Sequence, residues 1–137
     1  MVRIASPSKA KARTVSVNAH PAPVNLAQLA QSLQQFADAR DWGPFHSPKN
    51  LASALVVEAG ELLEHFQWMT EAQSRSLTAD KKQAVAHEMA DVLLYLVQLS
   101  SALGVDLMAA AHQKMAINAQ RYPVERAKGS SRKHDEL

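Results

Sequence analysis

The sequence predicts an all-α protein, a four-helix bundle, and three observations lead to that prediction. Apolar residues make up 47% of the chain but aromatic residues only 5%, and there are four glycines among 137 residues. This balance favours packed helices over a β-sandwich. Four segments repeat their apolar residues at helical spacing, and the links between them are short. Short links favour antiparallel neighbours, as in a bundle.

The first two helices are each marked by an N-terminal cap. Asn25 can cap the first helix, which the loop "RDWGPFHS" follows. Ser47 is the cap of the second helix, and Pro48 suits its first position because that residue needs no N–H donor. We expect this second helix to run to about Met69.

The last two helices are bounded in the same way. A polar linker with one short turn covers residues 70–77, and Thr78 can cap the third helix. Gly104 ends that helix, because glycine readily adopts the left-handed conformation that closes a helix. Asp106 caps the fourth helix, which ends before Pro123.

Charge divides the chain into three regions. The net charge is +2, but the basic excess lies at the two ends and the middle is acidic. We therefore expect a basic disordered tail over residues 1–24, a helical domain over residues 25–122 and a C-terminal tail over residues 123–137. A basic tail can contact nucleic acid or an anionic surface, although a solvated end explains it as well.

The chain lacks cysteine and a long apolar run, and both facts narrow the class of protein it can belong to. The chain has no cysteine, which excludes disulfides and thiolate zinc sites and fits a cytoplasmic location. The longest apolar run, residues 92–105, is interrupted by Gln98, Ser100 and Ser101 and is too short to span a bilayer. We expect no membrane association.

Acidic residues recur at a spacing of three on the second and third helices. Glu58 borders an apolar arc of its helix, and Glu61 lies just beyond that arc. Glu88 and Asp91 lie on a helix that is apolar on nearly every side. A buried carboxylate needs a partner, and the only bases between residues 51 and 107 are in or beside the polar linker.

Four carboxylates on two facing helices can hold a cation. All-oxygen ligation suits a hard ion, Mg²⁺ above Zn²⁺. A di-iron bundle would use Glu-x-x-His, which does not occur in this chain. Viewed down the helix axis, His65 points in a direction between those of Glu58 and Glu61, and it is a candidate hydrogen-bond partner of a metal ligand. A solvated structural face has the same spacing, so spacing alone does not separate the two explanations.

The fourth helix carries a polar stripe. Lys114, Asn118 and Arg121 fall on one face, and two cations with an amide suit a polyphosphate. A solvated stripe near a helix C-terminus explains the same residues. Trp68, by contrast, falls on the polar side of the second helix, so its ring needs a ligand base or another subunit as cover.

Taken together, these motifs resemble one family. The series Glu58-x-x-Glu61, Glu88-x-x-Asp91 and Lys114-x-x-x-Asn118-x-x-Arg121-Tyr122-Pro123 is similar to that of the MazG-like nucleotide pyrophosphohydrolases. The stretches "FADARDWGPFHSPKNLA", "EAGELLEHFQW" and "SSRKHDEL" resemble the small dCTP pyrophosphatase branch. The resemblance covers about residues 26–136.

The resemblance implies a fold, an activity and a set of site residues. The fold would be all-α and an obligate homodimer or homotetramer. The activity would be Mg²⁺-dependent cleavage of a nucleoside triphosphate, with dCTP or a modified dCTP favoured, to the monophosphate and pyrophosphate, as in clearing unwanted nucleotides from the pool. The metal ligands would be Glu58, Glu61, Glu88 and Asp91. The substrate contacts would be Trp42, His46, Lys49, Trp68, Tyr95, Lys114, Asn118, Arg121 and Tyr122. Glu61 is the preferred water-activating residue, but the sequence does not separate it from Glu58.

Some features leave the substrate and the class open. Certain dCTP-preferring members carry a histidine where this chain has Leu33, which leaves the base preference undecided. One alternative class is a non-catalytic helical oligomer whose basic tails bind nucleic acid or a partner protein. Another is a helical metal-storage or redox bundle. Of these classes, we expect the nucleoside triphosphate pyrophosphohydrolase, and we expect no nucleic acid partner.

Overall fold

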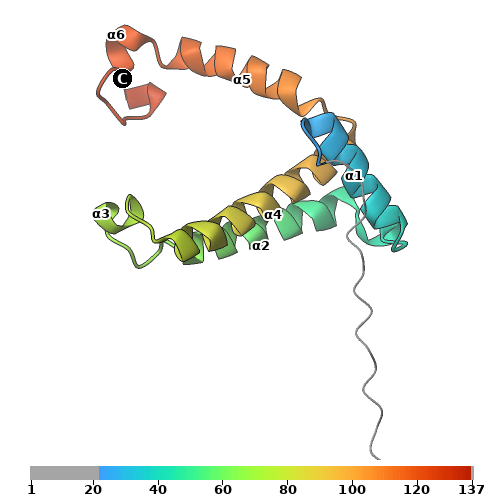
Figure 1. Cartoon of the computed structure of the whole chain (residues 1–137). Coiled ribbons are helices and arrows are strands. Elements are labelled where there is room, and N and C mark those ends of the chain that lie inside the picture. Colours follow the sequence, from blue (N-terminus) through green and yellow to red (C-terminus); the bar gives the residue numbers. More distant parts are fainter. Residues whose placement is uncertain (1–21, 137) are drawn as a thin grey trace, which may run out of the picture.

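The computed structural model describes residues 22–136 and consists there of helices and connecting loops (Figure 1). The long helices are α1 (Leu26–Asp38), α2 (Pro48–Glu64), α4 (Ala79–Leu103) and α5 (Leu107–Arg121). The short helices are η1 (Gly43–Phe45), α3 (Glu71–Ser74), α6 (Val124–Ala127) and η2 (His134–Glu136). The all-α class is therefore confirmed over these residues. Most of the predicted basic tail lies outside the described residues, and the predicted C-terminal tail contains α6 and η2.

The predicted caps form as side-chain hydrogen bonds. Asn25 accepts the N–H of Gln28 at 2.9 Å, and Asp106 accepts the N–H of Ala109 at 2.9 Å. The hydroxyls of Ser47 and Thr78 accept the corresponding N–H groups of α2 and α4. Each bond satisfies one of the N-terminal donors that a helix leaves unpaired. Gly104, at φ 63°, ends α4 in the left-handed conformation that glycine adopts without strain.

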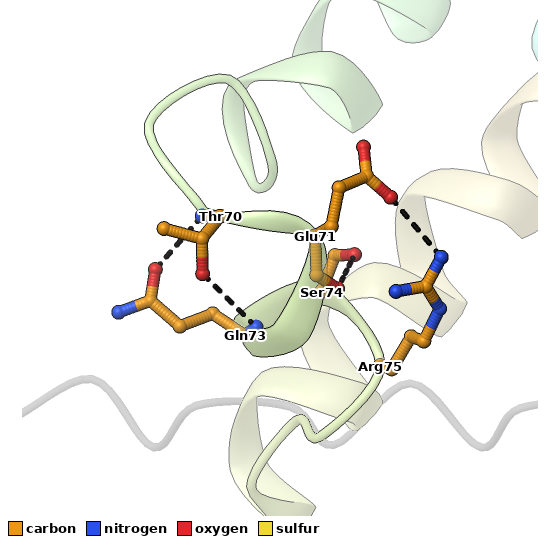
Figure 2. A network of polar contacts seen from close by, with 5 residues as sticks. All are labelled: Thr70, Glu71, Gln73, Ser74 and Arg75. Atoms are coloured by element: carbon orange, nitrogen blue, oxygen red, sulfur yellow. Dashed lines mark hydrogen bonds and ion pairs between the residues drawn. The ribbon is translucent and has the colours of Figure 1, made fainter.

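The second helix ends five residues earlier than the sequence indicates. α2 stops at Glu64, and residues 65–68 form turns. Tighter turns replace the helical hydrogen bonds there: the N–H of Phe66 bonds the carbonyl of Leu63, and the N–H of Met69 bonds the carbonyl of Phe66. These turns lead into a capping box: Thr70 is extended (φ −73°, ψ 162°), its hydroxyl accepts the N–H of Gln73, and the Gln73 side chain accepts the N–H of Thr70 at 2.8 Å (Figure 2).

The packed part of the chain is an antiparallel pair with one crossing helix. α2 and α4 lie side by side along their length, and α1 lies across the C-terminal end of α4 (Figure 1). The core is small: among the described residues, Ala37, Leu51, Val85 and Val97 are the buried apolar side chains. It lies between these three helices and sets the position of the acidic residues of α2 and α4.

The fourth long helix does not close a bundle within one chain. α5 turns away from α4 by 101° at the short break between them (Figure 1). Large apolar side chains therefore stay uncovered, including Val56 (70% exposed) and Leu63 (60%) on α2 and Met115 (70%) on α5. Met89 and Leu93 of α4 are exposed too, so α4 is not buried on all sides in a single chain as its composition predicts.

A helix that crosses a membrane needs a long, continuous apolar stretch. No single helix among residues 22–136 is long and apolar enough to cross a membrane, and only the bent pair α4–α5 passes the length and composition test together.

Candidate active site

Three of the four predicted metal ligands converge between α2 and α4. Glu58 of α2 and Glu88 and Asp91 of α4 each present a carboxylate oxygen, and these oxygens all lie within 4.8 Å of one another. All three residues are half-buried. Glu88 and Asp91 face α2 because a spacing of three places them on one side of α4. We call Glu58, Glu88 and Asp91 the acid cage.

The electrostatics of the cage favour a bound cation. The pKa of Glu58 is raised above its ordinary value, first by burial and then by the charges of Glu61, Asp91 and Glu88. Desolvation and nearby negative charges both make the ionised form of the Glu58 carboxyl group less favourable. A divalent cation among these oxygens would remove the repulsion.

Glu61 stands apart from the cage. Its side chain is exposed and does not belong to the set of mutually close oxygens. Its charge is nonetheless the largest electrostatic contribution to the raised pKa of Glu58. Glu61 therefore lies near the cage with one side open to solvent, where a water molecule can reach it.

One histidine borders the cage. The sequence predicted the side of α2 on which it lies but not the residue that it contacts. His65, directly after α2, lies with its Nε2 3.8 Å from Oε1 of Glu88, and both side chains are largely shielded. The helical spacing placed His65 on the side of Glu58 and Glu61, but its contact is with α4. Among the described residues, His65 is the only basic side chain in close contact with a cage residue.

The loop between α1 and α2 holds two of the predicted substrate contacts. The ring of Trp42 meets Phe36 edge-on at 5.7 Å and His46 at 5.9 Å, and Asp41 reverses the chain at φ 54°. His46 lines a cavity of about 210 Å³ between α1 and α4. Its polar lining also includes Gln34, Gln98 and Ser101. The signal for Gln98 and Ser101 was present in the sequence, where they interrupt an apolar helix, but it was not assigned to a site.

Trp68 lies at the opposite end of the α2–α4 pair. Its side chain is 89% exposed, and together with His65, Met69, Gln73 and Lys81 it lines an open groove of about 800 Å³. Because α2 ends at Glu64, the position of Trp68 follows from the turn of residues 65–68 rather than from a helical face. Its uncovered ring agrees with the expectation that something else must cover it.

The remaining predicted contacts lie apart from the cage in this single chain. Lys114, Asn118 and Arg121 are exposed on α5, which diverges from α2 and α4. Tyr122 follows them and meets the ring of His134 edge-on at 5.8 Å. Lys49 is exposed in the first turn of α2, and Tyr95 is half-buried on α4, one helical turn beyond Asp91. The structure thus separates the acid cage from Lys114, Asn118 and Arg121, which we call the phosphate stripe after the role predicted for these residues.

Comparison with known proteins assigns the chain to a family. The family model described as MazG-like matches residues 54–137. This chain belongs to the MazG-like family. It is 47% identical to dCTP pyrophosphatase 1 of Homo sapiens over 114 residues, which cover 82% of this chain and 67% of that protein. The corresponding protein of Rattus norvegicus is 45% identical over the same shares. The crystal structure of a pyrophosphatase from Archaeoglobus fulgidus aligns with a TM-score of 0.69 and 34% identity, covering 77% of this chain and 99% of that one.

The MazG-like assignment agrees with the donor set of the cage. Three carboxylate oxygens within 4.8 Å are hard ligands, which suit a small divalent cation such as Mg²⁺. The resemblance predicted from the sequence is thereby confirmed at the level of the family and its all-α fold. The roles of the individual residues stay predictions.

Proposed function

We propose that this MazG-like chain hydrolyses a nucleoside triphosphate, with dCTP or a modified dCTP favoured, to the monophosphate and pyrophosphate in the presence of Mg²⁺. The observation that carries the proposal is the acid cage, formed by Glu58, Glu88 and Asp91 in a chain 47% identical to dCTP pyrophosphatase 1. Removal of unwanted nucleotides from the pool is the role that such a reaction serves. We propose the cytoplasm as its location, which the absence of cysteine permits.

The proposed reaction is an in-line substitution at the α-phosphorus. Mg²⁺, when bound, neutralises phosphate charge and makes a bound water more acidic. Glu61, exposed beside the cage, accepts a proton from the attacking water as its oxygen bonds to phosphorus. The bond from the α-phosphorus to the bridging oxygen breaks, and pyrophosphate leaves with that oxygen. Glu58 stays a ligand in this assignment, because it lies inside the cage.

The base is proposed to bind at the loop between α1 and α2. Trp42 offers a ring for stacking, and His46, Gln34 and Gln98 place polar groups around the cavity of about 210 Å³. Imidazole and amide groups can donate to or accept from the edge of a pyrimidine. Leu33 lines the same cavity, so its apolar side chain influences which base fits.

A second copy of the chain is proposed to complete the site. The side chains suited to bind phosphate or sugar are Lys114, Asn118, Arg121 and Tyr122. In a single chain, however, α5 bends away from α4 by 101° and so leads away from the cage. Val56, Leu63 and Met115 are exposed on α2 and α5. Covering each of these side chains is worth about 1.5–3 kcal/mol. A homodimer or homotetramer would cover them and bring one chain's phosphate stripe to another's cage.

The activity is tested with a panel of nucleoside triphosphates and Mg²⁺, with monophosphate and pyrophosphate both quantified. We expect equal amounts of the two products and the highest kcat/KM for a cytosine deoxynucleotide. Release of inorganic phosphate with the diphosphate, or no turnover of any triphosphate, would contradict the proposal. Omitting Mg²⁺ in the presence of a chelator is the control and should stop the reaction.

The assembly is tested by light scattering at micromolar concentration. Leu63→Glu places a charge on the exposed apolar face of α2, and we expect it to shift the protein toward monomer and to lower turnover. Gln35→Glu places the same charge on an exposed position of α1 and serves as the matched control. A wild-type monomer that turns over at full rate would overturn the shared site.

A further inference from the structure

The cavity between α1 and α4 has polar side chains on both of its walls. Gln34 lies on α1, whereas Gln98 and Ser101 lie on α4. The spacing of three residues places Gln98 and Ser101 on one face of α4. All three side chains line the same cavity of about 210 Å³. The hydrogen bonds that they make within the chain decide which of their atoms are left for a ligand.

The two glutamine amides turn their nitrogen atoms toward their own helices. Nε2 of Gln98 donates to the carbonyl oxygen of Leu94 at 3.4 Å. Nε2 of Gln34 donates to Oδ1 of Asp38 at 2.7 Å. Carbonyl and carboxylate oxygens only accept, so the amide nitrogen must be the atom that faces each of them. Within residues 22–136 neither amide oxygen accepts a hydrogen bond, so both remain as acceptors.

Ser101 adds a further acceptor to the cavity. Its hydroxyl has a single hydrogen, which it donates to the carbonyl oxygen of Val97 at 3.0 Å. The lone pairs of its Oγ are therefore left for a donor. His46 lines the same cavity, but an imidazole nitrogen can either donate or accept, so His46 does not distinguish donors from acceptors on a ligand. The oriented polar atoms of the cavity are thus acceptors.

We propose that Gln98, Ser101 and Gln34 determine the base preference by accepting hydrogen bonds from an exocyclic amino group. Cytosine carries an amino group where thymine and uracil carry a carbonyl oxygen. The amino group can donate to these oxygens, whereas a carbonyl oxygen in its place leaves them unpaired, which is costly for partly buried groups. The inference rests on the proposed function, because it takes this cavity as the base site, and it names the residues that separate one pyrimidine triphosphate from another.

The test compares kcat/KM for dCTP and dUTP, which have the same sugar and phosphates and differ in the base. With the full chain and Mg²⁺, we expect the wild type to favour dCTP about tenfold or more. Gln98→Leu and Ser101→Ala should each lower the ratio of dCTP to dUTP about two- to tenfold, which is the usual contribution of one hydrogen bond. A purely structural role would lower both values together and leave their ratio unchanged.

The chain offers a matched control next to Ser101. The hydroxyl of Ser100 also donates to the carbonyl oxygen of Val97, at 2.8 Å, but Ser100 does not line this cavity. Ser100→Ala therefore removes the same kind of hydrogen bond from α4 and should leave the ratio unchanged. Circular dichroism identifies any variant that does not fold, and Gln34→Leu, at an exposed position of α1, then takes its place.

The outcomes separate this inference from the proposed function. Equal kcat/KM for dCTP and dUTP in the wild type would overturn the inference and leave the pyrophosphohydrolase activity intact. A wild-type ratio in both Gln98→Leu and Ser101→Ala would do the same. If no triphosphate is hydrolysed, the proposed function fails, and calorimetric binding of dCTP and dUTP decides the inference. Tighter binding of dCTP that both substitutions weaken would support it, and equal or absent binding would overturn it.

Discussion

The α2–α4 pair and helix α5 differ in how completely a single chain builds them. On α2 and α4, the acid cage is assembled from half-buried side chains that already lie within 4.8 Å of one another. On α5, Lys114, Asn118 and Arg121 are exposed, and the helix turns away from α4 by 101°. Metal binding should therefore be a property of one chain, whereas phosphate binding should depend on assembly.

In the cage region, substitutions of Glu61 and Glu58 should impair the enzyme in different ways. The loss of kcat in Glu61→Gln is the largest effect we expect. Glu61→Gln should lower kcat by about 10²- to 10⁴-fold, the usual contribution of a general base, while Mg²⁺ affinity is retained. Glu58→Gln should lower both, because it removes one oxygen donor from the cage. Mg²⁺ affinity is measured by calorimetry and kcat by product release. Full activity of Glu61→Gln would show that another group activates the water.

The phosphate stripe should show a smaller loss and a dependence on assembly. Lys114→Ala and Asn118→Ala should each lower kcat/KM about ten- to a hundredfold, since a hydrogen bond to a charged group is worth about 1.5–3 kcal/mol. Gln113→Ala, an exposed neighbour on α5, is the control and should have little effect.

Mixing two impaired variants, one changed in the cage region and one in the phosphate stripe, then tests whether the two regions come from different copies. If cage and stripe come from different copies, Glu61→Gln mixed with Lys114→Ala should recover activity, because some mixed sites contain neither change. Recovery is measured after subunit exchange and compared with the sum of the separate preparations. Unchanged activity after verified exchange would place cage and stripe in the same chain.

Trp68 should give a smaller effect, on substrate binding alone. Its indole is 89% exposed and lies at the other end of the α2–α4 pair from the base cavity of its own chain. We therefore expect it to close over a base bound mainly by a neighbouring subunit. Stacking on an aromatic ring is worth about 1–3 kcal/mol per base, and for this exposed ring we expect the lower end, a roughly fivefold rise in KM for the best pyrimidine. Mg²⁺ affinity should not change. Trp68→Phe should keep most of the binding, and an unchanged KM in Trp68→Ala would rule out stacking.

Local signals in the sequence predict the elements well because they act over a few residues. The caps at Asn25, Ser47, Thr78 and Asp106 form as predicted, since each needs only its own residue and an N–H three positions on. The end of α2 was missed because residues 65–68 form turns that lead into the capping box at Thr70, although Phe66 continues the apolar spacing of the helix. The spacing on each helix predicted the convergence of Glu58, Glu88 and Asp91, but it also placed Glu61 among the ligands, and Glu61 lies outside the cage. The contact of His65 with Glu88 and the divergence of α5 depend on tertiary geometry, which helical spacing does not contain.

The smallest expected effect is a pH dependence of the stabilisation by Mg²⁺. The pKa of Glu58 is raised from 4.5 by burial and by Glu61, Asp91 and Glu88, so the folded metal-free protein binds this proton more tightly than the unfolded chain does. The corresponding stability is fully present below 4.5 and is lost as the pH rises through the raised pKa. Near neutrality Mg²⁺ takes the place of the proton and raises the melting temperature by mass action. The rise in Tm with Mg²⁺ should therefore be larger near neutrality than just above pH 4.5.

In Glu58→Gln the side chain is neutral at every pH, so the metal-free protein should gain stability near neutrality relative to the wild type. Scanning calorimetry across this pH range measures both effects. A rise in Tm with Mg²⁺ that is the same at every pH would show that the charge of Glu58 is not what the metal neutralises.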